Sequence, residues 1–77
     1  MKKIKEEKDL EEGKFYFCKE RVYPFRLKIL EVKSTFEGNL FLGEDRFWAT
    51  KDNPQAFKRF DIVGPVEFPN FEEYEEI

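Results

Sequence analysis

The sequence predicts a mainly β (α+β) fold: a small SH3-like, partly open barrel of four to six short strands, a short helical turn and a candidate terminal helix. Short apolar runs alternate with turn residues along most of the 77-residue chain. Ten Phe, three Tyr and one Trp give this short chain a large contact area. Within 25–33 the apolar alternation changes phase, which indicates a bulge or a strand that passes from one sheet to another.

The first twelve residues are interpreted as a charged arm that precedes a single β-rich domain over residues 13–68. Apolar residues occur in this segment only at Ile4 and Leu10, a spacing that fits no helical face well. Its Lys and Glu pairs at helical spacing place the cation first, which is the weaker orientation. We therefore predict a frayed arm or a short helix that ends at Gly13.

The strand signals of the domain are short and separated by breakers. Pro24 removes a backbone donor and ends the first strand region, and Gly38 and Gly43 lie in turn signals that flank a short strand. The dipeptide Gly64-Pro65 is expected to break the closing strand. The predicted strands are 15–18 with 22–23 following before Pro24, then 25–33, 40–42, 47–50 and 61–63, with a candidate continuation at 66–68.

A helical turn is predicted before the closing strand. Asp52 or Asn53 can cap it, and Pro54 suits the first helical position. Phe57 and Phe60 lie three apart, so one turn would place both rings on the core.

The last segment, residues 69–77, is an acidic aromatic tail or short helix. Phe71, Tyr74 and Ile77 recur every third residue among glutamates, which would line them along one side of a helix. Because so short a helix is marginal in water, it would need docking or a partner.

Few groups capable of catalysis are present. The chain has no His, which excludes Ser-His-Asp and Cys-His arrangements and imidazole zinc sites. Its glycines are scattered and form no phosphate-binding loop. Cys18, the one cysteine, lies in an apolar run and is interpreted as a small buried hydrophobe. We predict a non-enzymatic protein that needs no cofactor and no metal.

The chain has a net charge of −3, and its charged residues are unevenly distributed along the sequence. Residues 1–12 hold four Lys against five acids, residues 13–66 hold ten bases against seven acids, and residues 67–77 hold five Glu and no base. In one hypothesis the acidic residues mimic DNA and bind a basic DNA-binding protein, with a homodimer doubling the acidic surface. The candidate partner-binding residues are Glu6, Glu7, Asp9, Glu11, Glu12, Glu67, Glu72, Glu73, Glu75 and Glu76.

The alternative hypothesis uses the basic body of the chain. Aromatic rings interleaved with cations can hold single-stranded nucleic acid by stacking and phosphate contact, and the acidic tail would then be regulatory. The sequence pI of about 5.0 argues against this alternative. Its candidate residues are Lys14, Arg21, Tyr23, Arg46, Trp48, Lys58 and Arg59.

Two stretches of the chain, Gly13-Lys14-Phe15-Tyr16-Phe17-Cys18-Lys19-Glu20 and Phe57-Lys58-Arg59-Phe60-Asp61-Ile62-Val63, resemble small SH3-like proteins encoded by bacterial viruses. The resemblance covers roughly residues 13–66. The family's usual Lys-Gly-Lys before the second strand is replaced here by Phe25-Arg26-Leu27-Lys28. The resemblance implies an accessory phage protein that binds and redirects a host protein, as DNA mimics that block nucleoid proteins or polymerase do; it implies no particular site residue.

The compartment follows from what the chain lacks. No apolar run approaches the roughly 20 residues that cross a bilayer, and the residues after Met1 lack the apolar stretch of a signal peptide. A single cysteine also fits a reducing compartment. We expect a cytoplasmic protein without a membrane partner, in the host cytoplasm if a phage encodes it.

Overall fold

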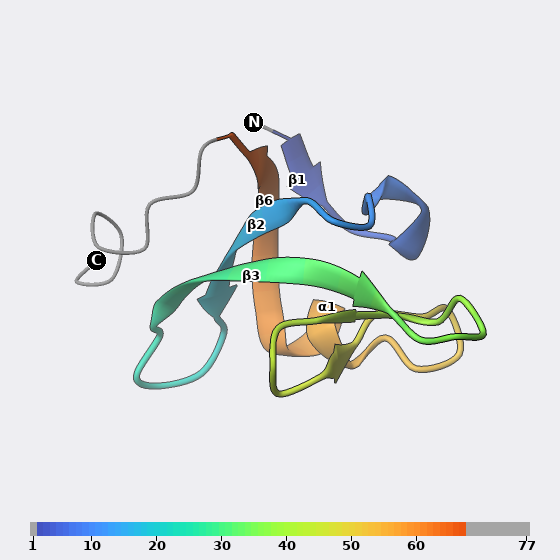
Figure 1. The fold of residues 1–77 in the computed structure, drawn as a ribbon. Coiled ribbons are helices and arrows are strands. Elements are labelled where there is room, and N and C mark those ends of the chain that lie inside the picture. Colours follow the sequence, from blue (N-terminus) through green and yellow to red (C-terminus); the bar gives the residue numbers. More distant parts are fainter. Residues whose placement is uncertain (1, 68–77) are drawn as a thin grey trace.

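The computed structural model describes residues 2–67, in which six strands form one antiparallel sheet of order β1-β6-β2-β3-β4-β5 (Figure 1). The sheet is open, because β1 and β5 are its two edges. The predicted fold class, a small and partly open β barrel with one short helix, is therefore confirmed. The elements are β1 (Lys2–Ile4), the 3-10 helix η1 (Glu7–Asp9), β2 (Phe15–Glu20), β3 (Leu27–Ser34), β4 (Leu40–Leu42), β5 (Phe47–Trp48), α1 (Gln55–Arg59) and β6 (Phe60–Val66).

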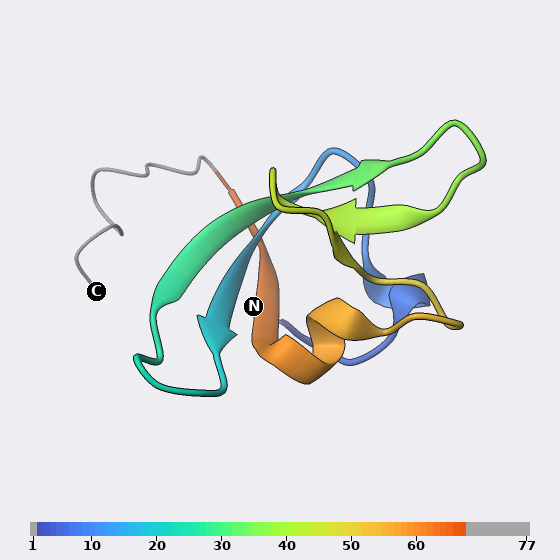
Figure 2. The same ribbon diagram turned by 90° about the horizontal axis from the view of Figure 1, so that it is seen from below.

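The core lies on one side of the β3-β2-β6 part of the sheet, where η1 and α1 also lie (Figure 2). Tyr16, Phe60 and Ile62 are almost completely buried there. The β4–β5 hairpin contributes Leu42 and Phe47 to the same cluster. A chain this short thus fills its core mainly with rings and branched side chains, as its composition predicts.

Strand β3 passes from one pairing partner to another. Its residues 27–31 pair with β2, and its residues 32–34 pair with β4. The register is continuous through both pairings, so the change of apolar phase does not mark a bulge in β3. Instead, Leu30 and Val32 belong to the core side, whereas Leu27 and Ile29 face the other side of the sheet.

The N-terminal segment belongs to the domain. Strand β1 pairs with β6 in the register Lys2 to Gly64 and Ile4 to Ile62. The side chains of Ile4 and Leu10 are buried in the core cluster. The prediction of a frayed arm is therefore wrong. Ile4 and Leu10 are six residues apart, which fits no single helix, but Ile4 lies in β1 and Leu10 directly follows η1, so both can reach the core. The short helix that forms, η1, ends before Gly13.

The helical turn α1 forms where it is predicted, with a different start. Pro54 is the N-cap residue and no side chain caps the helix, so the predicted capping by Asp52 or Asn53 is wrong. Phe60 is in the core, and Phe57 packs against it from the helix. The Phe57 and Phe60 rings therefore both face the core, as their spacing predicts.

Strand β6 continues through Gly64-Pro65, where a break was predicted. The pairing of β2 with β6 shifts register at this point, from Phe17 opposite Val63 to Phe15 opposite Val66, so the extra residue is absorbed in a bulge. A Cβ at Gly64 would lie 2.7 Å from Cδ2 of the Tyr16 ring. Glycine allows this close approach between β6 and the buried ring.

Candidate functional site

The loop between β2 and β3, residues 21–26, exposes three large hydrophobic side chains. The exposed fractions of Val22, Tyr23 and Phe25 are 62%, 86% and 52%. The Tyr23 and Phe25 rings meet edge to face, with 6.2 Å between their centroids. Phe25 has a φ of 57°, a left-handed conformation that bulky residues rarely adopt. Residues in such conformations are concentrated at functional sites.

Backbone hydrogen bonds hold this loop in place. The Glu20 N–H donates to the Arg26 carbonyl at 2.9 Å, and the Arg26 N–H donates to Oε1 of the buried Glu20 side chain at 3.0 Å. Within the loop, the Phe25 N–H donates to the Val22 carbonyl at 2.8 Å. The exposed rings therefore project from a loop whose two ends are fixed to each other.

The loop also contacts α1. The Arg21 N–H donates to the Arg59 carbonyl at 3.0 Å, and a hollow of about 410 Å³ lies between the loop and the helix. The Arg59 guanidinium lies 5.0 Å from the centroid of the Phe47 ring, and Arg21 forms an ion pair of 3.3 Å with Asp61. We call this region the basic aromatic end; it consists of Arg21, Val22, Tyr23, Phe25, Arg26, Lys58 and Arg59.

Four residues of the predicted nucleic-acid set, Arg21, Tyr23, Lys58 and Arg59, meet at the basic aromatic end. Sequence reasoning missed Val22, Phe25 and Arg26. The signal that could have found them is Pro24, because a proline between two aromatic residues interrupts the strand and leaves both in a loop.

The other three residues of that set lie elsewhere. Arg46 and Trp48 pack on the Phe41 ring at centroid distances of 5.4 and 5.5 Å. The Trp48 N–H donates to Gln55 Oε1, which joins β5 to the start of α1. Lys14 precedes β2, whereas Arg21 follows it, which places the two roughly 20 Å apart along an extended strand.

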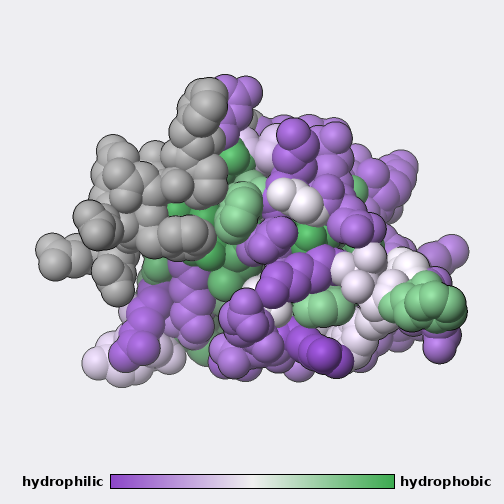
Figure 3. Space-filling view, in the orientation of Figure 1, coloured by the Kyte–Doolittle hydropathy of each residue, from purple (hydrophilic) through white to green (hydrophobic). Residues whose placement is uncertain are grey.

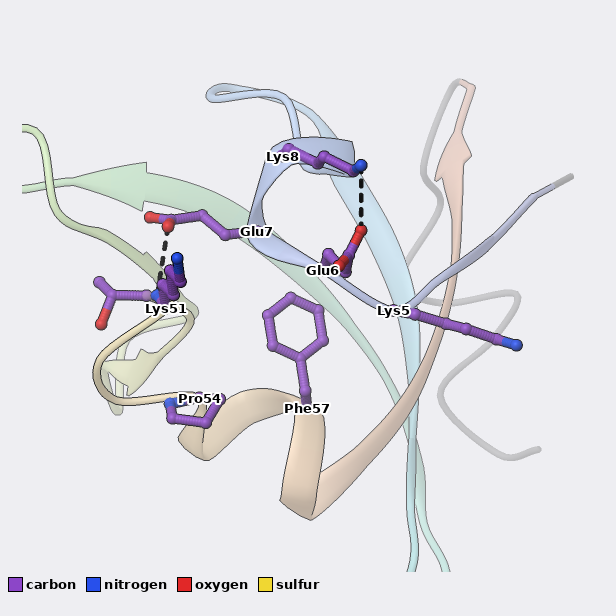
Figure 4. A pocket seen from close by; sticks show the side chains of 8 residues that line it. Lys5, Glu6, Glu7, Lys8, Lys51, Pro54 and Phe57 are labelled. Carbon is purple, nitrogen blue, oxygen red and sulfur yellow. Dashed lines mark hydrogen bonds and ion pairs between the residues drawn. The ribbon is translucent and has the colours of Figure 1, made fainter.

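A second hollow, of about 400 Å³, lies between η1 and α1 (Figure 4). The Phe57 ring points from α1 toward η1. Two of the predicted partner-binding acids are engaged here: Lys8 Nζ lies 3.3 Å from Glu6 Oε2, and the Lys51 N–H donates to Glu7 Oε1 at 3.2 Å. The hollow is lined by Lys5, Glu6, Glu7, Lys8, Thr50, Lys51, Pro54 and Phe57.

The remaining predicted acids fall into three groups. Asp9 forms an ion pair of 3.3 Å with Lys2, and Glu12 accepts a hydrogen bond of 2.8 Å from the Ser34 hydroxyl. The side chains of Glu11 and Glu67 are exposed. Outside the described residues lie Glu72, Glu73, Glu75 and Glu76, together with the candidate terminal helix and Phe68 of the candidate strand continuation.

Cys18 is buried in the core, as predicted. Its thiol donates to the Tyr16 carbonyl at a distance of 3.6 Å. Burial raises the pKa of the thiol to about 12, and a hydrogen bond with the Leu30 backbone and the charge of Lys28 offset this only in part. A thiol in this state is a poor nucleophile at neutral pH.

Two further properties concern the described residues only. Within residues 2–67, no three His, Cys, Asp or Glu side chains gather in a way that could hold a metal ion. The helices in that range are too short and too polar to cross a membrane. Compared with known proteins, the chain matches no family model, no curated protein and no solved structure.

Proposed function

We propose that this protein is a non-enzymatic module that binds single-stranded nucleic acid at the basic aromatic end. The observation that carries the proposal is the pair of exposed rings, Tyr23 and Phe25, on a fixed loop among arginines and a lysine. Bases stack on exposed rings, which contributes about 1–3 kcal/mol per base, and cations attract the phosphates. The sequence leaves two functions open, acidic mimicry of DNA and binding of single-stranded nucleic acid, and the function proposed here is the second of them.

The cations of this surface are available to a ligand. Arg21 and Asp61 are both about half exposed, and ion pairs of that kind contribute little to stability. A phosphate can therefore replace Asp61 as the partner of Arg21 at small cost. Lys58 and Arg26 are exposed beside the same loop and helix. The local excess of positive charge supports binding even though the whole chain is acidic.

Replacing Tyr23 or Phe25 with alanine is expected to weaken the binding of a short fluorescent oligothymidine by roughly tenfold to a hundredfold, because each loses one stacking platform. Fluorescence anisotropy titrations at several salt concentrations measure this, and log K should fall linearly with log salt. Phe36→Ala is the matched control, since Phe36 is fully exposed on the β3–β4 turn, away from this surface. Equal losses for Phe36→Ala and Tyr23→Ala, or no binding at all, would contradict the proposal.

A second candidate function is acidic mimicry of DNA toward a basic DNA-binding protein, in a phage-type inhibitor that acts as a homodimer. One observation favours it: Ile4 and Leu10 anchor the N-terminal segment in the core, so that its acids are displayed on a folded surface. A mimic needs such fixed carboxylates to match the spacing of phosphates. The ion pairs of Glu6 and Asp9 with lysines reduce the negative charge that this surface presents.

If mimicry is correct, the full chain should displace duplex DNA from a purified bacterial nucleoid protein, and the effect should weaken as salt rises. Reversing the charge of the exposed acids Glu11, Glu12 and Glu67 to lysine should abolish the competition. Glu37→Lys, at an exposed acid outside both acidic clusters, is the matched control. Competition that survives the triple reversal, or that is lost in Tyr23→Ala, would exclude this second function.

A further inference from the structure

The sheet has a second apolar face, on the side away from the core. In the β2–β3 pairing Phe17 lies opposite Ile29, and in the β2–β6 pairing Phe17 lies opposite Val63 and Phe15 opposite Val66. Directly opposed residues of antiparallel strands point to the same side of a sheet. We call this surface the outer apolar face; it consists of Phe15, Phe17, Leu27, Ile29, Val63 and Val66.

This face is distinct from the core. The alternate residues Tyr16, Cys18 and Ile62 belong to the core cluster on the other side. Ile29 and Val66 are only 8% and 7% exposed, yet neither belongs to that cluster. Figure 3 shows hydrophobic surface above β3. In residues 2–67 the helices η1 and α1 both lie on the core side, so neither covers the outer apolar face (Figure 2).

We propose that the chain's own last ten residues, 68–77, dock on the outer apolar face as an amphipathic segment. They follow Glu67 directly, and Val66 already belongs to this face. Three of their apolar residues recur at every third position, which lines them along one side of a helix. These residues are Phe71, Tyr74 and Ile77.

Length and charge fit this occupant. Ten helical residues span about 15 Å. The outer apolar face runs from the Phe15–Val66 pair to the pairing of Lys19 with Leu27, about 13 Å along β2. Lys19 and Lys3 are exposed cations that share this side of the sheet, since they lie opposite Leu27 and Val63. They complement the segment's glutamates, Glu72, Glu73, Glu75 and Glu76.

A nitroxide spin label on Glu76→Cys tests the proposal in the full chain by NMR. The introduced thiol can be labelled selectively, because Cys18 is buried. We expect the amide signals of Phe17, Ile29 and Val63 to lose most of their intensity while the nitroxide is paramagnetic and to recover it on reduction. The amide signals of Ala49 and Ala56, in the core on the opposite side, should lose much less. Losses of equal size on both sides would overturn the proposal.

Two comparisons identify the occupant. In the labelled chain, Phe71→Ala with Tyr74→Ala should abolish the selective loss, whereas Asn70→Ala, which keeps the apolar residues and the glutamates, should leave it in place. If the selective loss persists in the variant that lacks the Phe71 and Tyr74 rings, the segment does not dock through its apolar side and the proposal is overturned. Mixing ¹⁵N-labelled unmodified chain with spin-labelled ¹⁴N chain should cause no loss, and a selective loss in the mixture would assign the face to a second copy. The proposed nucleic-acid binding can fail without affecting any of these outcomes.

Discussion

Phe60→Ala is expected to lower the free energy of unfolding by about 3–5 kcal/mol. The Phe60 side chain is 1% exposed, and its ring meets the Phe47 ring edge to face with centroids 4.9 Å apart. It is the C-cap residue of α1 and the first residue of β6, so it joins the helix to the sheet through the core. Since small domains have only about 5–15 kcal/mol of total stability, this loss would remove a large part of the stability of the chain.

Urea unfolding followed by circular dichroism measures this effect. Phe36→Ala is the matched control, because it deletes the same atoms from a fully exposed ring and should change stability by less than about 0.5 kcal/mol. Phe60→Leu should fall between the two, because it leaves a smaller cavity. A cost for Phe60→Ala no greater than that for Phe36→Ala would show that the core is not assembled as described.

The second large effect is a loss of stability at high pH that depends on Cys18. Burial holds the pKa of its thiol at about 12 in the folded chain, against an ordinary value of 9.0. Below pH 9 the thiol is protonated in both states and has no effect. From pH 9 to pH 12 only the unfolded chain releases the proton, which favours unfolding by up to about 4 kcal/mol. Burial also raises the pKa of Tyr16, which adds a loss in the same direction.

Urea unfolding of the wild type and of Cys18→Ala at several pH values between 8 and 11 isolates the contribution of the thiol. The wild type should lose more stability over this range than the variant, which retains the contribution of Tyr16. A maleimide should also react with Cys18 only when the chain is unfolded. Equal pH dependence in the two proteins would contradict the burial of the thiol.

Local signals account for what the sequence predicted correctly. The aromatic run that contains Phe15, the helical turn with Phe57 and Phe60 on the core, and the burial of Cys18 each depend on a few neighbouring residues. Spacing of three or alternation of two is fixed by backbone geometry, so these features appear in the sequence. The fold class follows from the number and shortness of such signals.

Four residues of the basic aromatic end, Arg21, Tyr23, Lys58 and Arg59, were predicted from the sequence, but not that they share a surface. Arg21 and Arg59 are far apart in the chain, and they meet because β2 pairs with β6, into which α1 leads. The same pairing leaves Lys14 at the far end of β2. No local pattern shows which cations share a surface, because that depends on how strands pair. The exposure of Tyr23 and Phe25 likewise became visible only with the fold.

The sequence by itself determined the mainly β class, the positions of most turns, the place of the helical turn and the scarcity of catalytic groups. Only the tertiary structure decided that Lys2–Ile4 is a strand and that β6 runs through Gly64-Pro65. Neither segment has a strong strand signal of its own. Lys2–Ile4 is a strand because β6 gives it hydrogen-bond partners. Strand β6 continues through Gly64-Pro65 because its pairing with β2 accommodates a bulge and Gly64 leaves room for the Tyr16 ring. Pairing between distant segments supplies hydrogen bonds and burial that local propensity does not contain.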